Sequence, residues 1–328
     1  NGYRSMVLSD FSSNYLFLRL NTNVWRINYQ NLFAQLTADV FNQDGFFPQK
    51  YLANHHLSVN VTKNLNIGLF ETILFNRGDT SSTGGNGNDA FDLRYLNPII
   101  FYRSIEQQAG SPDNAILGMD FKWNFLKKFS LYGQLVIDEF VISEIRAWNG
   151  WRGNKQSGQI GFKYIDVAGV NNLDLQAEIN IARPYMYSHN FLYGEFSNYN
   201  QELVHPLGAN FYEFVGITRF QPYKRLNLVG KLIYARYGTD QEGENYGQNI
   251  FLDNSTFERE FGNFIGQGIR TDLLFLDFTA TWQLRHNMFV DFKQIIRRLN
   301  SALDNQDDTS IFTSIVFRWN IPQRLFEF

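Results

Sequence analysis

The sequence predicts an all-β protein: a transmembrane, antiparallel, up-and-down β-barrel of about fourteen strands with long extracellular loops. Apolar and polar residues alternate along many short segments, and short and long connections alternate between those segments. Aromatic residues make up 17% of the 328 residues, yet the mean hydropathy is −0.30. No stretch approaches the roughly 20 apolar residues of a membrane-spanning helix. A barrel explains how a chain rich in aromatic residues can have a low mean hydropathy, because its strands interleave lipid-facing apolar and lumen-facing polar positions.

The alternation is clearest between Leu173 and Ile181, where every second residue is apolar and the residues between them are polar. A period of two indicates a strand with one wet face. The same pattern returns in 117–125 and 274–285. It also returns in 25–33, with one exception, the apolar Leu32 at a polar position. Parity assigns a set of charged residues to the lumen: Asp120, Lys122, Asp138, Asp174, Glu178, Asp277, Asp291, Lys293 and Arg318. Such mixed signs line a water-filled channel or cross-link into ion pairs that rigidify a closed barrel.

The connections alternate in length, as in outer-membrane barrels, where short turns are periplasmic and long loops extracellular. The predicted short turns are 21–23, 63–66, 126–128, 168–171, 221–225 and 285–287. The predicted long loops are 42–52, 76–113, 143–156, 185–206, 238–266 and 300–309. Because the last strand, 311–320, has to descend toward the periplasm, every short turn is assigned to that side. The strand count includes residues 3–9, whose pattern is the weakest.

Four tryptophans provide an independent check on this orientation. Trp25, Trp123, Trp282 and Trp319 share the parity of the apolar face, and each lies near a short turn or the end of the chain. Aromatic girdles of this kind mark membrane interfaces. We therefore expect a girdle at the periplasmic interface; the alternative is that the rings fill a soluble core. The whole chain, 1–328, is expected to form one barrel domain in the bacterial outer membrane.

The longest loop, 76–113, departs from the β pattern. A run rich in Gly, Ser and Asn precedes Asn97 and Pro98, and Asn at the N-cap with Pro at the first helical position indicates a helix start. The sequence predicts a short helix here, folded over or into the barrel mouth as a plug. An extended loop segment is the alternative. The residues assigned to this element are Tyr95, Asn97, Pro98, Tyr102, Arg103 and Glu106.

Two pieces of the sequence look familiar. They are YLNPIIFYRSIEQQ at 95–108, followed by GSPDN at 110–114, and FRWN at 317–320. Together they resemble Bacteroidota outer-membrane proteins of the RemB-like gliding-motility and Wzi-like capsule-assembly type. The resemblance implies a surface binding or assembly barrel: Wzi-like members hold capsular polysaccharide as lectins, and the motility relatives are associated with gliding and type IX secretion. It also implies that the N-terminal portion of the family is missing here.

The residues that catalysis or metal binding would need are sparse. An outer-membrane phospholipase needs a Ser beside a His, but Ser188 and His189 are adjacent residues, which on a strand point to opposite faces. Cysteine is absent, and His55 and His56 lack further ligands, so we expect no enzyme, no metal site and no cofactor. Surface histidine is the simpler interpretation. The net charge of −3 argues against a nucleic-acid partner.

The outer loops carry aromatic rings beside planar hydrogen-bonding side chains, a combination that holds sugars. The candidate ligand-binding residues are Trp148, Trp151 and Arg152 in one loop and Tyr185, Tyr187 and Tyr193 in another, which also holds Tyr199 and Asn200. The alternative is that these rings pack the loops together and close the mouth. We therefore expect a non-enzymatic barrel in outer-membrane lipid or lipopolysaccharide that binds a surface polysaccharide or another envelope or secretion protein. A solute channel is the alternative.

Overall fold

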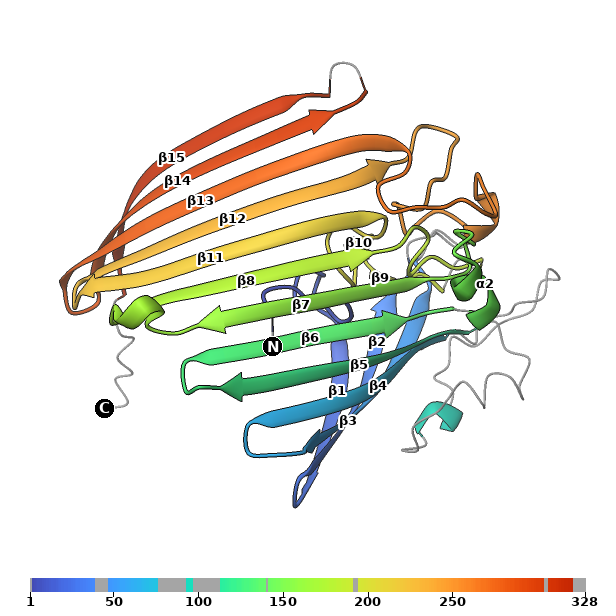
Figure 1. Cartoon of the computed structure of the whole chain (residues 1–328), viewed down its shortest axis with the longest axis horizontal. Helices are drawn as coiled ribbons and strands as arrows, with labels where there is room; N and C mark the ends of the chain where they lie inside the picture. Colours follow the sequence, from blue (N-terminus) through green and yellow to red (C-terminus); the bar gives the residue numbers. More distant parts are fainter. Residues whose placement is uncertain are drawn as a thin grey trace, which may run out of the picture.

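The computed structural model describes residues 2–38, 47–75, 93–96, 113–139, 141–190, 194–303 and 306–320. Within them, thirteen strands form one antiparallel sheet in which neighbours in sequence are neighbours in space (Figure 1). The sheet strands are β1 (Leu16–Val24), β2 (Ile27–Thr37), β3 (Gln49–Asn60), β4 (Leu65–Phe75), β5 (Asn114–Phe125), β6 (Phe129–Ile137), β7 (Gln156–Tyr164), β8 (Leu173–Ala182), β11 (Phe211–Tyr223), β12 (Leu226–Thr239), β13 (Ile269–Arg285), β14 (Met288–Ser301) and β15 (Asp308–Trp319).

The connections contain the remaining elements of the described residues. These are the hairpin of β9 (Ser197–Asn198) and β10 (Gln201–Glu202), the helix α2 (Ile142–Ala147), and the 3₁₀ turns η1 (Leu93–Leu96), η2 (Val167–Gly169) and η3 (Asn254–Thr256). No helix in this part of the chain is long and apolar enough to cross a membrane.

The antiparallel, up-and-down all-β fold confirms the prediction, but two details differ. Residues 3–9 form no strand: the N–H groups of Tyr3, Arg4 and Met6 bond to side chains of the sheet, and the N–H of Ser9 bonds to the Leu203 carbonyl. This reduces the sheet to thirteen strands. The predicted closed ring is not observed either: within the described residues β1 and β15 each pair with a single neighbour, and both edge strands are exposed along most of their length.

Short and long connections lie at opposite ends of the sheet, as the sequence predicts. Figure 1 shows the hairpin turns at one end and the long connections, with α2, at the other. The first turn was predicted at 21–23, but those residues lie in β1 and the chain reverses at Trp25 and Arg26. Trp25 adopts a left-handed backbone with φ of 53°. The polar residues 21–23 have the composition of a turn, but they are polar because β1 is an exposed edge strand of the sheet.

The register gives the sheet two different faces. We define the inner face as the one that contacts the N-terminal segment, which Glu178 of β8 does. The alternate residues of β8, Leu175 and Ile179, are on the outer face, where Ile179 pairs across to Phe214. Because side chains alternate strictly along a strand, this assignment extends through the ladder to every other strand. The outer face is mostly apolar and exposed.

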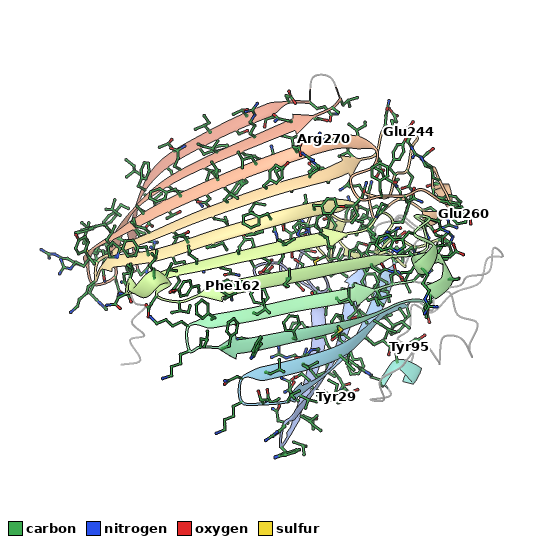
Figure 2. All side chains as sticks on the ribbon, in the orientation of Figure 1. Tyr29, Tyr95, Phe162, Glu244, Glu260 and Arg270 are labelled. Carbon is green, nitrogen blue, oxygen red and sulfur yellow. The ribbon has the colours of Figure 1, made fainter. Side chains whose placement is uncertain are left out.

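The tryptophans gather on the outer face at the short-turn end. Trp123, Trp282 and Trp319 are each within a few residues of a short turn or of the end of β15, and all three are exposed. Phe162 lies at the same end, where Phe129 stacks on it at 5.6 Å between ring centroids (Figure 2). This arrangement matches the predicted girdle for three of its four tryptophans, whereas Trp25 lies in the β1–β2 turn and not on the apolar face of a strand.

The inner face near the long-loop end is filled by the chain itself. We call this filling the inner plug: the N-terminal segment 2–15 and the described residues of the loop 183–210. Met6 and Phe196 of the plug pack against Leu52, Leu74 and Ile116 of the strands, all fully buried. The apolar residues of the inner face therefore bury themselves against the plug, where each large side chain contributes roughly 2 kcal/mol.

The outward position of the tryptophans can be tested with brominated lipids. Consider a variant in which every tryptophan except Trp282 is replaced by Phe, reconstituted in vesicles. We expect lipids brominated near the headgroup to quench its fluorescence strongly, and lipids brominated near the chain end to quench it less, because Trp282 lies at the short-turn rim of the outer face. A variant that keeps only the loop residue Trp151 serves as control. Equal quenching of the two variants would contradict the outer-face assignment.

Candidate functional site

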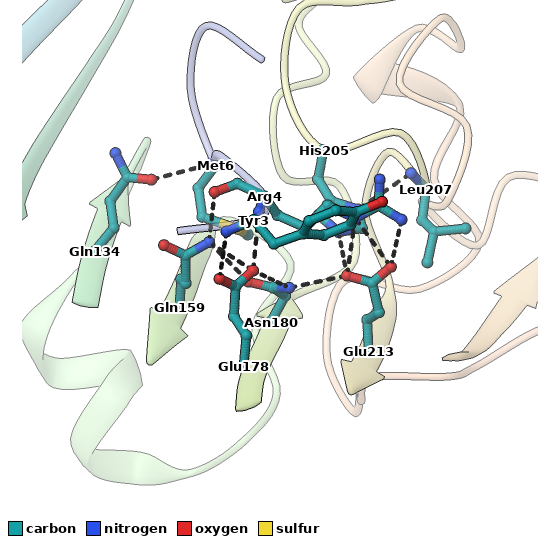
Figure 3. Close-up of polar contacts among 10 residues, drawn as sticks. All are labelled: Tyr3, Arg4, Met6, Gln134, Gln159, Glu178, Asn180, His205, Leu207 and Glu213. Atoms are coloured by element: carbon teal, nitrogen blue, oxygen red, sulfur yellow. Dashed lines mark hydrogen bonds and ion pairs between the residues drawn. The ribbon is translucent and has the colours of Figure 1, made fainter. Parts of the chain in front are cut away.

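The N-terminal segment is held inside the sheet by side chains of the inner face (Figure 3). The backbone N–H groups of Tyr3 and Arg4 donate to the Glu178 carboxylate at 2.7 and 3.0 Å. The N–H of Met6 donates to Oε1 of Gln134 at 2.9 Å. An irregular segment can lie inside a barrel only if its backbone polar groups find partners. Here the strands supply those partners.

Glu213 of β11 is the second anchor of the segment. The Arg4 guanidinium donates to it from Nη2 at 2.8 Å and from Nε at 3.2 Å, and Asn180 Nδ2 donates at 2.9 Å. His205 of the plug loop approaches through Nε2 at 2.8 Å. The side chains of Glu213 and His205 are completely buried. Burial lowers the pKa of His205 although the Glu213 carboxylate opposes this. The partner of the buried carboxylate is therefore chiefly Arg4.

Glu178 has no capacity left for a ligand. Besides the two backbone groups, it accepts from the Tyr132 hydroxyl at 2.7 Å, from Gln159 at 3.2 Å and from Asn180 at 3.1 Å. A carboxylate offers about four lone-pair positions. Glu178 therefore holds the plug and is not available as a catalytic acid or base.

The plug loop is tied to the opposite wall by the hairpin β9–β10. The Lys50 ammonium donates to the Glu195 carbonyl at 2.9 Å and to Ser197 Oγ at 2.8 Å. Asn198 accepts from the backbone N–H of Thr37 at 2.9 Å and donates to Ser13 Oγ at 2.9 Å. The hairpin thus joins β2, β3 and the N-terminal segment.

The outer loops also bind one another. The N–H of Gly262 donates to the Asn149 carbonyl at 2.7 Å, and the N–H of Asn263 donates to the Gly150 carbonyl at 2.9 Å. The Arg152 guanidinium lies 3.9 Å from the ring centroid of Phe257. Tyr185 donates from its hydroxyl to the Asn245 carbonyl at 2.8 Å. Loops 138–155, 183–210 and 240–268 therefore form one interlocked cap.

Two of the candidate ligand-binding tyrosines are inside this cap. Tyr185 and Tyr187 are completely buried, and burial raises the pKa of Tyr185 to about 12. Their rings have no exposed face, so in this structure they pack the loops together, as the alternative interpretation held. Tyr193 lies outside the described residues. The aromatic content of the loop gave no signal that would separate packed rings from exposed ones.

The candidates in the other loop are separated from each other. Trp148, which ends α2, is 92% exposed and borders a cavity of about 560 Å³ on the outer face together with Leu135 and Ile181. Trp151 is partly buried over Gly153, and Arg152 is engaged with Phe257. The structure therefore does not bring the six candidates together into one site.

A further exposed ring stands at the long-loop end, in the β9–β10 hairpin. Tyr199 and Asn200 are the two central residues of the β9–β10 turn, with φ of 51° and 58°. These values match a type I′ turn, which projects its central side chains outward. Tyr199 is 60% exposed. The sequence signal for this turn is the run 198–200, in which two Asn residues flank Tyr199.

Of the predicted plug element, the structure describes only Tyr95 and its neighbours in η1. Tyr95 is completely buried, with its ring 4.4 Å from that of Phe75 and its hydroxyl bonded to Asp113. The register places Phe75 on the outer face, so the assignment of Tyr95 to a plug in the barrel mouth is wrong. Asn97, Pro98, Tyr102, Arg103 and Glu106 lie outside the described residues. The α-helix found in the described part, α2, belongs to a different loop.

The charged residues assigned to the lumen mostly find opposite charges or other polar partners. Asp277 lies 3.5 Å from both Lys231 and Lys293. Arg318 donates to Asp291 at 3.2 Å. Asp120 contacts His56 at 2.6 Å, Asp174 accepts from the N–H of Asp166 at 3.2 Å, and Asp138 lies buried 3.9 Å from Lys155. This pattern corresponds to the cross-linked alternative.

The interpretation of the histidines as surface residues is wrong for two of them. His205 is buried against Glu213, as described above. His55 is completely buried on the outer face of β3, where the rings of Tyr29 and Phe33 meet it edge-on at 5.8 and 6.3 Å. Its neighbours in register, Asn31 and Glu71, are buried as well. Among the described residues no cluster of His, Asp and Glu is suited to a metal ion.

No protein-family profile matches the chain, and no curated protein matches it. Among solved structures, the chain is similar to Wzi, an outer-membrane protein involved in group 1 capsule assembly in Escherichia coli and a carbohydrate-binding β-barrel. The two are 16% identical with a TM-score of 0.63, over 99% of this chain and 65% of Wzi. The chain is also similar to OccD3 (OpdP) of Pseudomonas aeruginosa, at 9% identity and a TM-score of 0.44, over 93% of this chain and 67% of that chain.

The chain therefore spans about two thirds of the length of Wzi, 65%. At this level of identity the likeness concerns the fold. It supports the Wzi-like part of the predicted resemblance at that level, whereas the Bacteroidota source and the motility role stay predictions. The thirteen-stranded sheet of the described residues resembles the fold of an outer-membrane β-barrel such as Wzi, although β1 and β15 do not pair to close it.

Proposed function

We propose that the chain forms an outer-membrane barrel that binds a carbohydrate polymer at its long-loop end and does not conduct solutes. One observation carries the proposal: the inner face is occupied by the inner plug, whose backbone and whose Arg4 saturate Glu178 and Glu213. A barrel filled in this way offers surfaces for binding and little free path for solutes. The likeness to Wzi, itself a carbohydrate-binding β-barrel, supports the same function.

The binding surface that we propose is the tip of the β9–β10 hairpin. Tyr199 presents an exposed ring at the centre of the turn. An aromatic face of this kind packs against the C–H groups of a sugar ring. The hairpin is fixed from below by Lys50 and Asn198. Because the tip is held rigidly, little conformational entropy is lost on binding.

The biological role that we favour is attachment of a capsule-like polysaccharide to the cell surface. It follows from the proposed binding surface and from the likeness to a capsule-assembly protein. An accessory role in gliding or type IX secretion, which the sequence resemblance implies, would require a protein partner at the same cap. Lipopolysaccharide would surround the barrel in either role.

A solute channel is the second candidate, because one section of the inner face is polar and open. Lys231, Asp277 and Lys293 form a mixed-charge row on β12–β14, and the Lys293 side chain is 43% exposed. Rows of this kind line aqueous pores. Conductance measurements distinguish the two functions.

We expect the protein to give no steady conductance in planar bilayers. Replacing Arg4 with Gln should produce flickering currents, because it leaves the buried Glu213 charge without its main partner, at a cost of about 3–5 kcal/mol to the packed plug. Arg236→Gln is the matched control, since it removes an arginine from the exposed Arg236–Asp272 pair on the outer face and costs at most about 1 kcal/mol. Steady currents from the unaltered protein would favour the channel.

The plug loop should loosen as the pH falls. Burial, helped by Lys155, lowers the pKa of His189 from 6.5 to about 4. Between these two pH values, His189 binds a proton in the loosened loop but not in the packed loop. The contribution of neutral His189 to the stability of the packed loop is therefore fully present above pH 6.5 and is lost as the pH falls toward 4. The loss at pH 5 is about 2 kcal/mol.

Hydrogen exchange of residues 183–190 and 194–205, compared at pH 7 and pH 5 after correction for intrinsic rates, measures this effect. His189→Gln should flatten the difference. His286→Gln, in an exposed short turn, should leave it unchanged. Identical pH dependence in all three proteins would contradict the assignment to His189.

Removing the Tyr199 ring should weaken carbohydrate binding. On an array of bacterial surface polysaccharides, we expect Tyr199→Ala to lose about tenfold in affinity for whichever glycan the unaltered protein binds, equivalent to ~1.4 kcal/mol. Trp148→Ala should lose less than about twofold, because that ring lies beside the outer face of the sheet. The reverse ranking would move the site to α2, and absence of any glycan binding would refute the function.

A further inference from the structure

The two ends of the sheet carry opposite charge. The short turns contain six basic residues, Arg26, Lys63, Lys127, Lys128, Lys224 and Arg225, against the single acid Asp166. The loop 240–268 at the other end contains six acids, Asp240, Glu242, Glu244, Asp253, Glu258 and Glu260, against the single base Arg259. Glu244 and Glu260 mark this acidic end in Figure 2. An anionic molecule is therefore attracted to the short-turn end and repelled from the other.

A cavity of about 370 Å³ opens at the basic end, between the ends of β11, β12, β13, β14 and β15. Its walls include Asn227, Gln283 and Arg318, which the register places on the inner face. Lys224 and Arg225 of the β11–β12 turn form its rim. The backbone N–H of Gln283 donates to the Arg225 carbonyl at 2.8 Å, so the rim is fixed to the wall. This volume lies within the range of small-ligand sites.

Four polar side chains of this cavity are free to bind a ligand. Within the described residues, the amides of Asn227 and Gln283 make no side-chain hydrogen bond, and neither does the ammonium of Lys224 or the guanidinium of Arg225. Arg318 lies 4.5 Å from the ring centroid of Phe289 and donates to Asp291 from Nε and Nη2, which leaves Nη1 for another acceptor. Phe289 adds an apolar surface between these polar groups.

We infer that this cavity is a binding site for an acidic saccharide, a sugar that carries a carboxylate. Guanidinium and ammonium groups suit the carboxylate, the two free amides suit hydroxyl groups, and the Phe289 ring suits the C–H face of a pyranose. Lipid headgroups carry the same anionic charge. They meet the outer face of the barrel, however, whereas the lining of this cavity belongs to the inner face.

The inference deepens the proposed function, on which it rests, because it names the substrate class and adds a second contact. A polymer with uronic-acid residues would meet this site on the periplasmic side, to which the short turns are assigned, and would meet the neutral contact at Tyr199 only at the cell surface. The acidic loop 240–268 would disfavour the same polymer at the cap unless its carboxylates point away. The two sites therefore have different charge requirements.

Calorimetric titration of the full chain in detergent with trigalacturonate tests this site, and maltotriose serves as the neutral probe. We expect trigalacturonate to bind at least tenfold more tightly than maltotriose at low salt. The double variant K224Q/R225Q should reduce trigalacturonate affinity at least tenfold. The control K63Q/K127Q removes the same two charges from other short turns and should change affinity less than threefold. N227A/Q283A should weaken both probes.

Equal losses in the two charge variants would overturn the inference, because they would indicate attraction to the whole rim without a site. Absence of trigalacturonate binding, or equal affinity for both probes, would overturn it as well. Binding of phosphatidylglycerol vesicles that K224Q/R225Q abolishes, without trigalacturonate binding, would assign the cavity to a lipid headgroup instead. If Tyr199→Ala abolishes polysaccharide binding while K224Q/R225Q has no effect on trigalacturonate, the proposed function survives and this inference fails.

Discussion

The structure depends on one constraint: the buried polar groups of the inner face need hydrogen-bonding partners. Glu178 and Glu213 come from neighbouring strands, and both are buried. An isolated buried carboxylate would be too costly, so both require donors that the sheet cannot provide alone. The N-terminal segment brings the Arg4 guanidinium and two backbone N–H groups. The same bonds satisfy the backbone of a segment that has no secondary structure, so plug and wall stabilise each other.

Packing extends this dependence to the long-loop end. The plug loop adds His205 beside Glu213, buries Tyr187 and Phe196 in the apolar part of the inner face, and joins the opposite wall through Lys50. The loops above it then bond to one another. The result is a molecule with a closed, acidic end and a polar, basic opposite end. Binding functions at both ends follow from this asymmetry more directly than conduction does.

The parity of the strands could be read from the sequence because it depends only on local geometry. Glu178 and Asp277 reach the same face as their polar neighbours for that reason. The hydrogen-bonding partners of these residues could not be predicted from the sequence. Arg4 and Glu213 are 209 residues apart, and nothing in either segment identifies the other. The sequence predicts a strand at 3–9 for the same reason, because nothing in it shows that the segment bends, with φ of 53° at Leu8, and bonds to side chains of the sheet.

The site was harder to predict than the fold. Tyr185 and Tyr187 belong to a loop with the composition of a sugar-binding loop, yet their side chains are buried. Only tertiary contacts decide whether such a ring is exposed or buried. Trp148 belongs to a loop by sequence, yet it stands beside Leu135 and Ile181 on the outer face. The free amides of Asn227 and Gln283 belong to strands without any motif. They become a candidate site only when the register places them next to Arg318.

The central claim is that the outer face of the sheet meets hydrocarbon, while the inner face of the central strands, β8 among them, meets the inner plug. The chain has no cysteine, so spin labels can be placed singly at every position from Leu173 to Ala182 of β8 and their accessibility measured in lipid vesicles by power saturation. Collisions with oxygen should peak at Leu175, Ala177, Ile179 and Ile181, with minima at Gln176, Glu178 and Asn180. A profile without this period of two, or high accessibility of the Glu178 position to a water-soluble nickel complex, would contradict the account.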